Sequence, residues 1–301
     1  MERIQYAIAK ARAERDARGE TGAAPAAGAD VRPREARRPA QPARPVPAPS
    51  RAEPPAPGPS EEEIMKAWRA LPALRTTPRQ AVRNRLVSLA GGTGSAEMDG
   101  IRTRLLQHMR ARGARRVAIT SPGPGCGKST VTLNLGFSLG RQEDQRTIVA
   151  DVDLRRPQMH KALGIREKHS FSTVLDGAGA FEANAVRHGQ NLAFATNHGP
   201  ARNPAELLQS RRAADALAAI EEIYQPTVML FDLPPLLVND DAMAFLGQMD
   251  CALIVAAAEK TTIKEIDRAE RDVASQTFVL GVILNRCRYM DRADGYSEYY
   301  G

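Results

Sequence analysis

The chain reads RVAITSPGPGCGKST from Arg116 to Thr130, and these fifteen residues are the strongest indication of its fold. It joins a strand-like apolar run to a glycine-rich loop, which the helix-like run VTLNLGFSL follows. Gly123, Gly125 and Gly127 let backbone N–H groups approach an anion closely, and the N-terminus of the following helix adds its partial positive charge. A glycine-rich loop between a strand and a helix is the context of a nucleotide-phosphate loop.

The loop also assigns roles to its polar side chains. Lys128 is expected to reach the β- and γ-phosphates of a nucleotide, and the Ser129 hydroxyl to coordinate Mg²⁺. Pro122 stands where the pattern G-x-x-x-x-G-K-[ST] has its first glycine. Cys126 is either a redox-sensitive thiol, because a helix N-terminus lowers thiol pKa values, or a small residue that fills the loop, and we prefer the second interpretation. The residues of this loop predicted to contact the nucleotide are Gly123, Gly125, Cys126, Gly127, Lys128, Ser129 and Thr130.

Three carboxylates stand at or near the ends of strand-like runs. Asp151 and Asp153 follow the run RTIVA, and Asp232 follows the run TVMLF. Alternate residues of an extended segment project to the same side, so both Asp151 and Asp153 can face the crevice that holds Lys128. Asp232 has the position of a Walker-B aspartate, which holds Mg²⁺ directly or through water.

Beyond the loop, short apolar strands alternate with longer amphipathic helices. This alternation predicts an α/β fold of the P-loop NTPase type, with a mostly parallel sheet and helices on both faces. The ligand is then expected beyond the carboxyl ends of the strands. One long helix is predicted over 205–224, and no internal repeat is present.

The composition divides the chain into four regions. Residues 1–20 predict a short amphipathic helix. Residues 21–60 contain 11 of the 21 prolines and many alanines, and they predict a disordered Pro/Ala-rich linker. Residues 61–288 predict the P-loop ATPase domain, which opens with a capping box made by Ser60 and Glu63. Residues 289–301 predict a flexible tail.

Chain length, cysteine content and the length of apolar runs limit the classes of protein to which the chain can belong. The 301 residues, 43% of them apolar, suffice for one substantial core, and three cysteines without metal-type spacing indicate neither a disulfide framework nor a zinc site. No apolar run approaches the roughly 20 residues of a membrane span, and the N-terminus lacks the apolar core of a signal peptide. We therefore expect the protein to stay in the cytoplasm.

Positive charge is concentrated in the first part of the chain. Residues 1–120 hold 23 Lys and Arg against 12 Asp and Glu, whereas residues 121–301 hold 19 against 23. A basic excess can face nucleic acid or an anionic membrane surface. Here the arginines are interleaved with acids and show no aromatic stacking pattern, which favours a solvated surface.

Four segments together carry a family resemblance: SPGPGCGKST, IVADVDLRRP, VMLFDLPPLLVNDD and GVILN. They resemble the bacterial tyrosine autokinases of exopolysaccharide and capsule assembly, within the wider group of P-loop ATPases that includes plasmid-partition and septum-placement proteins. The similarity covers roughly residues 95–290. The discriminating motif is D-x-D-x-R, matched by Asp151, Asp153 and Arg155. Partition-type relatives carry a lysine where this chain has Gly123, which favours the kinases.

This resemblance implies ATP and Mg²⁺ as cofactors and a role for each matching residue. Lys128 and Ser129 would bind phosphate and metal. Asn285 occupies the place where the group contacts the adenine base, and Arg155 is assigned to the nucleotide site. The implied metal ligands are Ser129, Asp153 and Asp232, and the implied catalytic residues are Lys128, Asp151, Asp153 and Asp232.

A proton acceptor for the tyrosine hydroxyl is also implied. It is either Asp151 or Asp153, and the sequence does not choose between these two carboxylates. The acceptor tyrosines are expected in the tail, YMDRADGYSEYYG, which holds four of the six tyrosines of the chain. Its glycine and acids predict a flexible, exposed segment, as an acceptor must be. The predicted phosphoacceptors are Tyr289, Tyr296, Tyr299 and Tyr300.

We thus expect a cytoplasmic Mg-ATP-dependent protein-tyrosine autokinase that regulates polysaccharide biosynthesis and export. The alternative, from another class, is an ATP-driven switch or scaffold, similar to the partition ATPases, that transfers no phosphate to protein. A nucleic-acid-binding partition protein is the weakest interpretation, because it rests only on the basic N-terminal half.

The expected partners follow from the same resemblance. Since the chain shows no membrane span, its transmembrane activator is expected to be a separate polypeptide that holds it at the inner membrane. A homo-oligomer is also expected. The family's ring-forming helix carries E-x-x-R-x-x-R, of which this chain keeps Arg102 but has Ala96 and Asp99 at the other two places.

Overall fold

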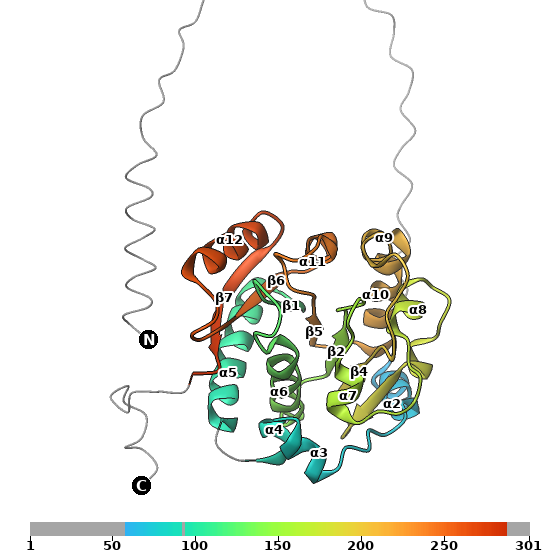
Figure 1. The fold of residues 1–301 in the computed structure, drawn as a ribbon. Coiled ribbons are helices and arrows are strands. Elements are labelled where there is room, and N and C mark those ends of the chain that lie inside the picture. Colours follow the sequence, from blue (N-terminus) through green and yellow to red (C-terminus); the bar gives the residue numbers. More distant parts are fainter. Residues whose placement is uncertain (1–57, 92–93, 288–301) are drawn as a thin grey trace, which may run out of the picture. The chain divides into compact units, whose positions relative to one another are not determined.

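The structure is a computed structural model that describes residues 58–91 and 94–287 (Figure 1). The helix predicted at 1–20, the linker up to residue 57 and the tail at 289–301 lie outside the described residues, and so do the four predicted phosphoacceptor tyrosines. No helix within the described ranges is long and apolar enough to cross a membrane.

A seven-stranded sheet runs through the described part of the chain (Figure 1). The strands are β1 (Arg116–Thr120), β2 (Thr147–Asp151), β3 (Ala185–His188), β4 (Leu192–Ala195), β5 (Val228–Asp232), β6 (Cys251–Ala257) and β7 (Phe278–Asn285). Their order is β3-β4-β2-β5-β1-β6-β7. Every neighbouring pair is parallel except β3 and β4, which are antiparallel. The prediction of a mostly parallel sheet is confirmed.

Helices cover both faces of this sheet (Figure 1). On one face lie α3 (Pro78–Arg83), α4 (Val87–Ala90), α5 (Ser95–Arg112), α6 (Lys128–Gly140) and α7 (Met159–Leu163). On the other lie α2 (Glu61–Ala70), α8 (Phe171–Leu175), the short 3-10 helix η1 (Phe181–Ala183), α9 (Pro204–Gln209), α10 (Arg211–Tyr224), α11 (Asp241–Leu246) and α12 (Ile263–Ala274).

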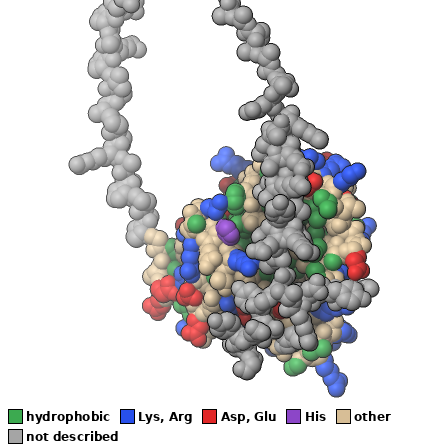
Figure 2. Space-filling view, turned by 90° about the vertical axis from the view of Figure 1, so that its left-hand side faces the viewer, with side chains coloured by type: hydrophobic (Ala, Val, Ile, Leu, Met, Phe, Trp, Pro, Cys, Tyr) green, Lys and Arg blue, Asp and Glu red, His purple; other side chains and the backbone are tan. Residues whose placement is uncertain are grey.

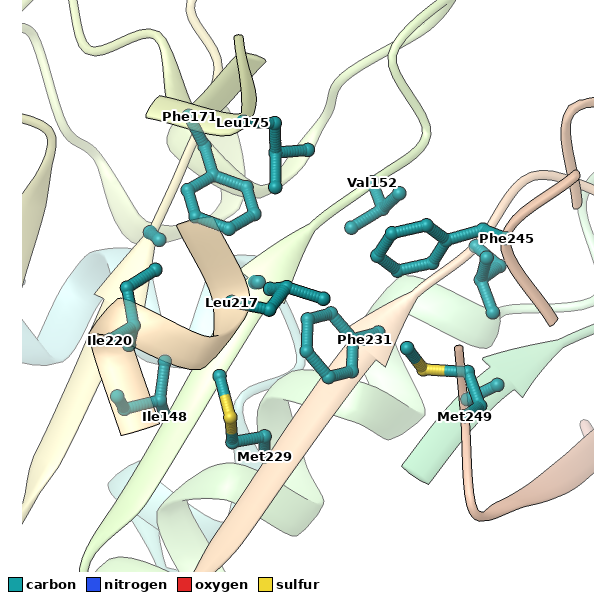
Figure 3. Close-up of a cluster of buried hydrophobic side chains, with 14 of the residues drawn as sticks. Ile148, Val152, Phe171, Leu175, Leu217, Ile220, Met229, Phe231, Phe245 and Met249 are labelled. Atoms are coloured by element: carbon teal, nitrogen blue, oxygen red, sulfur yellow. The ribbon is translucent and has the colours of Figure 1, made fainter. Parts of the chain in front are cut away.

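The two cores follow from the alternation of side chains along the strands. In β2, Ile148 and Ala150 point into one core and Val149 into the other, as the two-residue period of a strand requires. Figure 3 shows the first core, where Phe231 from β5 packs edge-on against Phe245 from α11 with ring centroids 5.5 Å apart. Burying each such side chain contributes about 1.5–3 kcal/mol.

The single helix predicted over 205–224 is wrong. The chain forms two helices, α9 and α10, which separate at Ser210. Ser210 has extended backbone angles, with φ −69° and ψ 149°, and its hydroxyl accepts a hydrogen bond from the Ala213 N–H. A serine oxygen satisfies a free N–H at a helix start, so Ser210 caps α10 instead of continuing α9.

The capping box predicted at Ser60 is present. The Ser60 hydroxyl accepts from the Glu63 N–H at 3.3 Å, and the Glu63 carboxylate accepts from the Ser60 N–H at 2.8 Å.

Acidic and basic side chains are interspersed with apolar ones on the face drawn in Figure 2. On that face the described residues therefore resemble an ordinary solvated surface.

Candidate functional site

The strand order brings the predicted site residues to one edge of the sheet. β5 lies between β1 and β2, and Asp232 is in register with Ile119 on one side and Asp151 on the other. The glycine-rich loop leaves β1 at this edge and enters α6 at Lys128. Three segments that are distant in sequence thus end at the same place, where parallel α/β sheets bind ligands.

Lys128 is the centre of a buried charge cluster. Its ammonium donates to Asp153 Oδ2 at 2.8 Å and lies 3.5 Å from Asp232 Oδ1. Burial alone would lower the pKa of Lys128, but the negative charges of Asp232 and Asp153 outweigh it and raise that pKa above its ordinary value. The lysine is therefore charged and held by carboxylates at the start of α6.

Ser129 and Asp232 form the second contact of the cluster. The Ser129 hydroxyl donates to Asp232 Oδ2 at 2.5 Å. Burial raises the pKa of Asp232, and the neighbouring Lys128 charge and the Ser129 hydrogen bond offset only part of that effect. The structure thus places a hydroxyl and a carboxylate, both oxygen donors of the kind Mg²⁺ prefers, side by side.

Asp151 and Asp153 both lie at the cluster, but their surroundings differ. Asp151 is fully buried; its Oδ2 accepts from the Met159 N–H at 3.2 Å, and its Oδ1 has no hydrogen-bond partner among the described residues. Burial, followed by the charge of Asp232, raises the pKa of Asp151 well above its ordinary value. Asp153 has Lys128 on Oδ2, and its Oδ1 accepts from the Arg156 N–H at 3.3 Å.

Two of the three glycines of the loop are required by its shape. Gly125 and Gly127 have φ of +77° and +92°, in the left-handed region that favours glycine. A Cβ added at Gly127 would lie 2.2 Å from the Asn285 Nδ2 atom. Gly123 differs, because its φ is not positive and a Cβ there would meet nothing within 4 Å.

Asn285, the last residue of β7, contacts the phosphate loop at Cys126. The Asn285 Nδ2 donates to the Cys126 carbonyl at 2.9 Å, so Asn285 is a loop contact in this structure, and its adenine contact stays a prediction. Cys126 is buried, and its thiol donates to the Gly123 carbonyl at 3.2 Å. Thr130 lies in the first turn of α6, where its carbonyl accepts from Asn134.

Arg155, the arginine of the D-x-D-x-R motif, pairs with a different carboxylate. Its Nη2 donates to Asp241 Oδ1 at 2.9 Å, and Asp241 is the first residue of α11 and is buried. This hydrogen bond, together with the charge of Asp241, raises the pKa of Arg155. The ion pair ties the β2–α7 segment to α11, and a direct contact of Arg155 with nucleotide stays a prediction.

Sequence reasoning missed Lys260 and Thr261, which follow β6. The Lys260 ammonium donates to the Pro124 carbonyl at 2.9 Å, and the Thr261 hydroxyl lies 3.5 Å from the Cys126 sulfur. Both reach the phosphate loop because β6 is the neighbour of β1 in the sheet. The sequence does show that both residues follow an apolar strand. It does not show that this strand pairs with β1, and only that pairing brings the two residues to the loop.

Asp99, which replaces an arginine of the ring-forming motif in α5, makes its contacts within the same chain. Asp99 Oδ1 accepts from Arg102 at 3.1 Å and from the Ser138 hydroxyl at 2.5 Å, and Arg141 also pairs with it. Arg102 further donates to the Ser138 carbonyl at 3.1 Å. The one arginine that matches the motif is therefore engaged within its own chain, between α5 and α6.

The residues at this edge fit a Mg²⁺-nucleotide. A glycine cradle leads to a buried lysine and a serine hydroxyl, and Asp151 Oδ1 is a buried oxygen without a partner in the described residues. No three His, Cys, Asp or Glu side chains within the described ranges are arranged to hold a metal by themselves. Mg²⁺ is usually held by one or two carboxylates with phosphates and water, so Ser129, Asp153 and Asp232 could hold it only together with a nucleotide.

Comparisons with known proteins agree with this geometry. Residues 117–300 match the family described as the CobQ/CobB/MinD/ParA nucleotide binding domain. The chain is 30% identical over 209 residues to the tyrosine-protein kinase YwqD of Bacillus subtilis. This match covers 69% of the present chain and 86% of YwqD. It is also 26% identical over 232 residues to the tyrosine-protein kinase ptk of Acinetobacter johnsonii, and that match covers 71% of the present chain and 31% of ptk.

A solved kinase-domain structure is also similar to this chain. The VpsO kinase domain is similar with a TM-score of 0.57 and 26% identity, and the match covers 69% of this chain and 98% of that domain. The first curated relatives are much longer proteins, and the chain spans 31% of their length.

Proposed function

We propose that this chain, which belongs to the CobQ/CobB/MinD/ParA nucleotide-binding domain family and within it to the bacterial tyrosine kinases, is a Mg-ATP-dependent protein-tyrosine autokinase. It would regulate the biosynthesis and export of exopolysaccharide or capsular polysaccharide. The observation that carries the proposal is the buried cluster in which Lys128 meets Asp153 and Asp232 at the end of a glycine-rich loop.

This cluster supports phosphoryl transfer because that reaction depends mainly on positioning and charge neutralisation. The Lys128 ammonium would bind the terminal phosphates, and the loop N–H groups would hold the nucleotide in place. Ser129, Asp153 and Asp232 would hold Mg²⁺, which supplies further neutralisation of phosphate charge when bound. Binding requires Lys128 to exchange a carboxylate contact for a phosphate contact.

The tyrosine hydroxyl must also lose its proton during transfer. Either Asp151 or Asp153 would accept it, since both carboxylates belong to the cluster around Lys128. A general base must come within hydrogen-bond reach of the hydroxyl. Asp151 offers an oxygen with no other partner among the described residues, whereas both Asp153 oxygens already accept hydrogen bonds. This difference favours Asp151 as the proton acceptor and Asp153 as a metal ligand. Because Asp151 is fully buried, this role requires that nucleotide binding opens the site and brings the tyrosine hydroxyl within reach of its free oxygen.

The acceptors and partners form the finer part of the proposal. The acceptors would be the tail tyrosines, Tyr289, Tyr296, Tyr299 and Tyr300. A tail that enters the site of another copy requires self-association, so a homo-oligomer is proposed. By the family resemblance, a transmembrane polysaccharide co-polymerase would activate the kinase and hold it at the inner membrane.

A transfer assay tests the proposal. The purified chain is incubated with Mg²⁺ and ATP labelled at the γ-phosphate, and the labelled amino acid is identified after hydrolysis of the protein. We expect phosphotyrosine in the wild type and none in Lys128→Met. Hydrolysis of ATP without any labelled protein, with a membrane activator present, would favour the alternative function of an ATPase switch.

A further inference from the structure

Three carbonyl groups of the phosphate loop accept hydrogen bonds from side chains, and two of these side chains come from outside the loop. The Pro124 carbonyl accepts from the Lys260 ammonium at 2.9 Å, and the Cys126 carbonyl accepts from Asn285 Nδ2 at 2.9 Å. The Gly123 carbonyl accepts from the Ser121 hydroxyl at 2.8 Å and from the Cys126 thiol. Each of these three carbonyls thus has a donor that fixes its direction.

The direction of a carbonyl fixes the direction of the next N–H. In a planar trans peptide the C=O and the following N–H point in opposite directions. Lys260 therefore sets the direction of the Gly125 N–H, and Asn285 sets that of the Gly127 N–H. The peptide after Gly123 contributes no donor, because proline has no N–H. Two N–H groups of the cradle are thus oriented by two side chains from outside the loop, one in the turn after β6 and one at the end of β7.

Lys260 projects from a firmly held turn between β6 and α12. The Ala257 N–H donates to the Thr261 hydroxyl at 2.9 Å, and the Ala258 N–H donates to the Asn285 carbonyl at 2.8 Å. Glu259 has φ of +60°, a conformation that non-glycine residues keep only where the surroundings enforce it. The base of the Lys260 side chain is therefore fixed relative to Asn285 and the loop.

We propose that Lys260 is a positioning residue of the nucleotide site. By holding the Pro124 carbonyl toward its own ammonium, it keeps the opposite group of that peptide, the Gly125 N–H, directed toward the expected phosphate position before a nucleotide arrives. A backbone that is already oriented pays less ordering cost on binding, so the lysine raises phosphate affinity without touching the phosphate. This inference rests on nucleotide binding, one part of the proposed function, and it is independent of phosphate transfer to tyrosine.

The test measures ADP binding by calorimetry in the full chain. Lys260→Met removes the donor, and Lys260→Arg keeps a charged donor. Lys264→Met is the matched control, because Lys264 is an exposed lysine on the adjoining helix α12. We expect Lys260→Met to bind ADP about tenfold more weakly, which corresponds to ~1.4 kcal/mol. Lys260→Arg should recover most of the affinity, and Lys264→Met should match the wild type.

Two further readouts separate positioning from other roles. The thermal midpoint of Lys260→Met without nucleotide should stay near that of the wild type, since the contact orders a surface loop and not the core. The loss of affinity should persist at high ionic strength, because a hydrogen bond to a carbonyl is not screened as a direct charge contact with phosphate is. A loss that disappears at high salt would assign Lys260 to direct phosphate contact and overturn the proposal.

The remaining outcomes are equally distinct. If Lys260→Met binds ADP within twofold of the wild type, the positioning role is wrong while nucleotide binding stands. If Lys260→Met unfolds at a much lower temperature and Lys260→Arg does not recover affinity, the residue is structural and the proposal fails. A wild type that does not bind ADP would remove both this inference and the proposed function.

Discussion

The ammonium of Lys128 lies 2.8 Å from Oδ2 of Asp153, so the cation of the phosphate loop is neutralised by the carboxylate that follows β2. The Oδ1 atom of Asp232 lies 3.5 Å from the same ammonium. Lys128 thus offsets part of the buried negative charge of both carboxylates. We therefore expect changes at Lys128 to affect stability as well as nucleotide binding, and the two effects can be measured separately.

Replacing Lys128 with methionine should abolish phosphate transfer and leave a folded but less stable protein. Removing one partner of a buried ion pair leaves an uncompensated charge and costs about 3–5 kcal/mol when the pair is fully buried. Urea unfolding of Lys128→Met measures this loss. The double variant Lys128→Met/Asp153→Asn should recover part of it, because the unpaired carboxylate is also gone. Full activity of Lys128→Met would contradict the assignment of the phosphate loop.

Asparagine substitutions should distinguish the two carboxylates after β2. Asp151→Asn keeps an oxygen for the Met159 N–H but removes the proton acceptor, so turnover should fall about 10²–10⁴-fold with an unchanged Mg²⁺ requirement. Asp153→Asn should also lower turnover, and it should raise the Mg²⁺ concentration needed for half-maximal activity. Titration of Mg²⁺ against initial rate measures both. If Asp151→Asn keeps wild-type turnover, Asp151 is not the base.

Alanine substitutions in the loop offer a matched pair of glycines. Gly127→Ala places a Cβ against Asn285 and forces φ of +92° on a residue with a side chain, so we expect a loss of about 1–3 kcal/mol and weaker ADP binding. Gly123→Ala meets open space and an ordinary φ, and its stability should change by no more than about 0.5 kcal/mol. Equal losses for the two variants in urea unfolding would show that the backbone conformation described for Gly127 is wrong.

The stability of the domain should depend on His188 in mildly acidic solution. His188 packs edge-on against Phe137 with ring centroids 5.3 Å apart, and burial lowers its pKa below the ordinary value of 6.5. The unfolded chain therefore binds a proton more readily than the folded one, and stability falls as the pH drops below about 6.5. The stability of the wild type relative to His188→Gln should shrink over this range. His108→Gln, at an exposed position of α5, serves as the control, and a constant difference for His188→Gln would exclude the linkage.

Much of the fold could be predicted because its signals are local. The glycine loop between a strand and a helix placed β1 and α6, and the capping box at Ser60 and Glu63 placed the start of α2. The break at Ser210 was missed because apolar residues occur on both sides of it, at Leu208 and again at Ala213, so periodicity alone predicts one helix. The short antiparallel strand β3 was missed as well, since a four-residue edge strand gives too little pattern to detect.

The site was predictable to the extent that its residues follow strands in a recognisable pattern. Asp151, Asp153 and Asp232 could be placed because each follows an apolar run that had to be a strand. Lys260 could not, because its contact with Pro124 depends on β6 lying next to β1. The pairing of Arg155 with Asp241 was likewise hidden, since it joins two loops whose proximity only the folded chain defines.

Transfer of phosphate to tyrosine can be detected directly by mapping phosphotyrosine in the chain after incubation with Mg-ATP. Mass spectrometry should find phosphate on the tail tyrosines of the wild type. In the triple variant Tyr296→Phe, Tyr299→Phe, Tyr300→Phe, the rings remain but the acceptor hydroxyls are gone, so most phosphate should disappear while ATP hydrolysis persists. If the wild-type protein hydrolyses ATP but never contains phosphotyrosine, even with a membrane activator present, the chain is not a tyrosine autokinase.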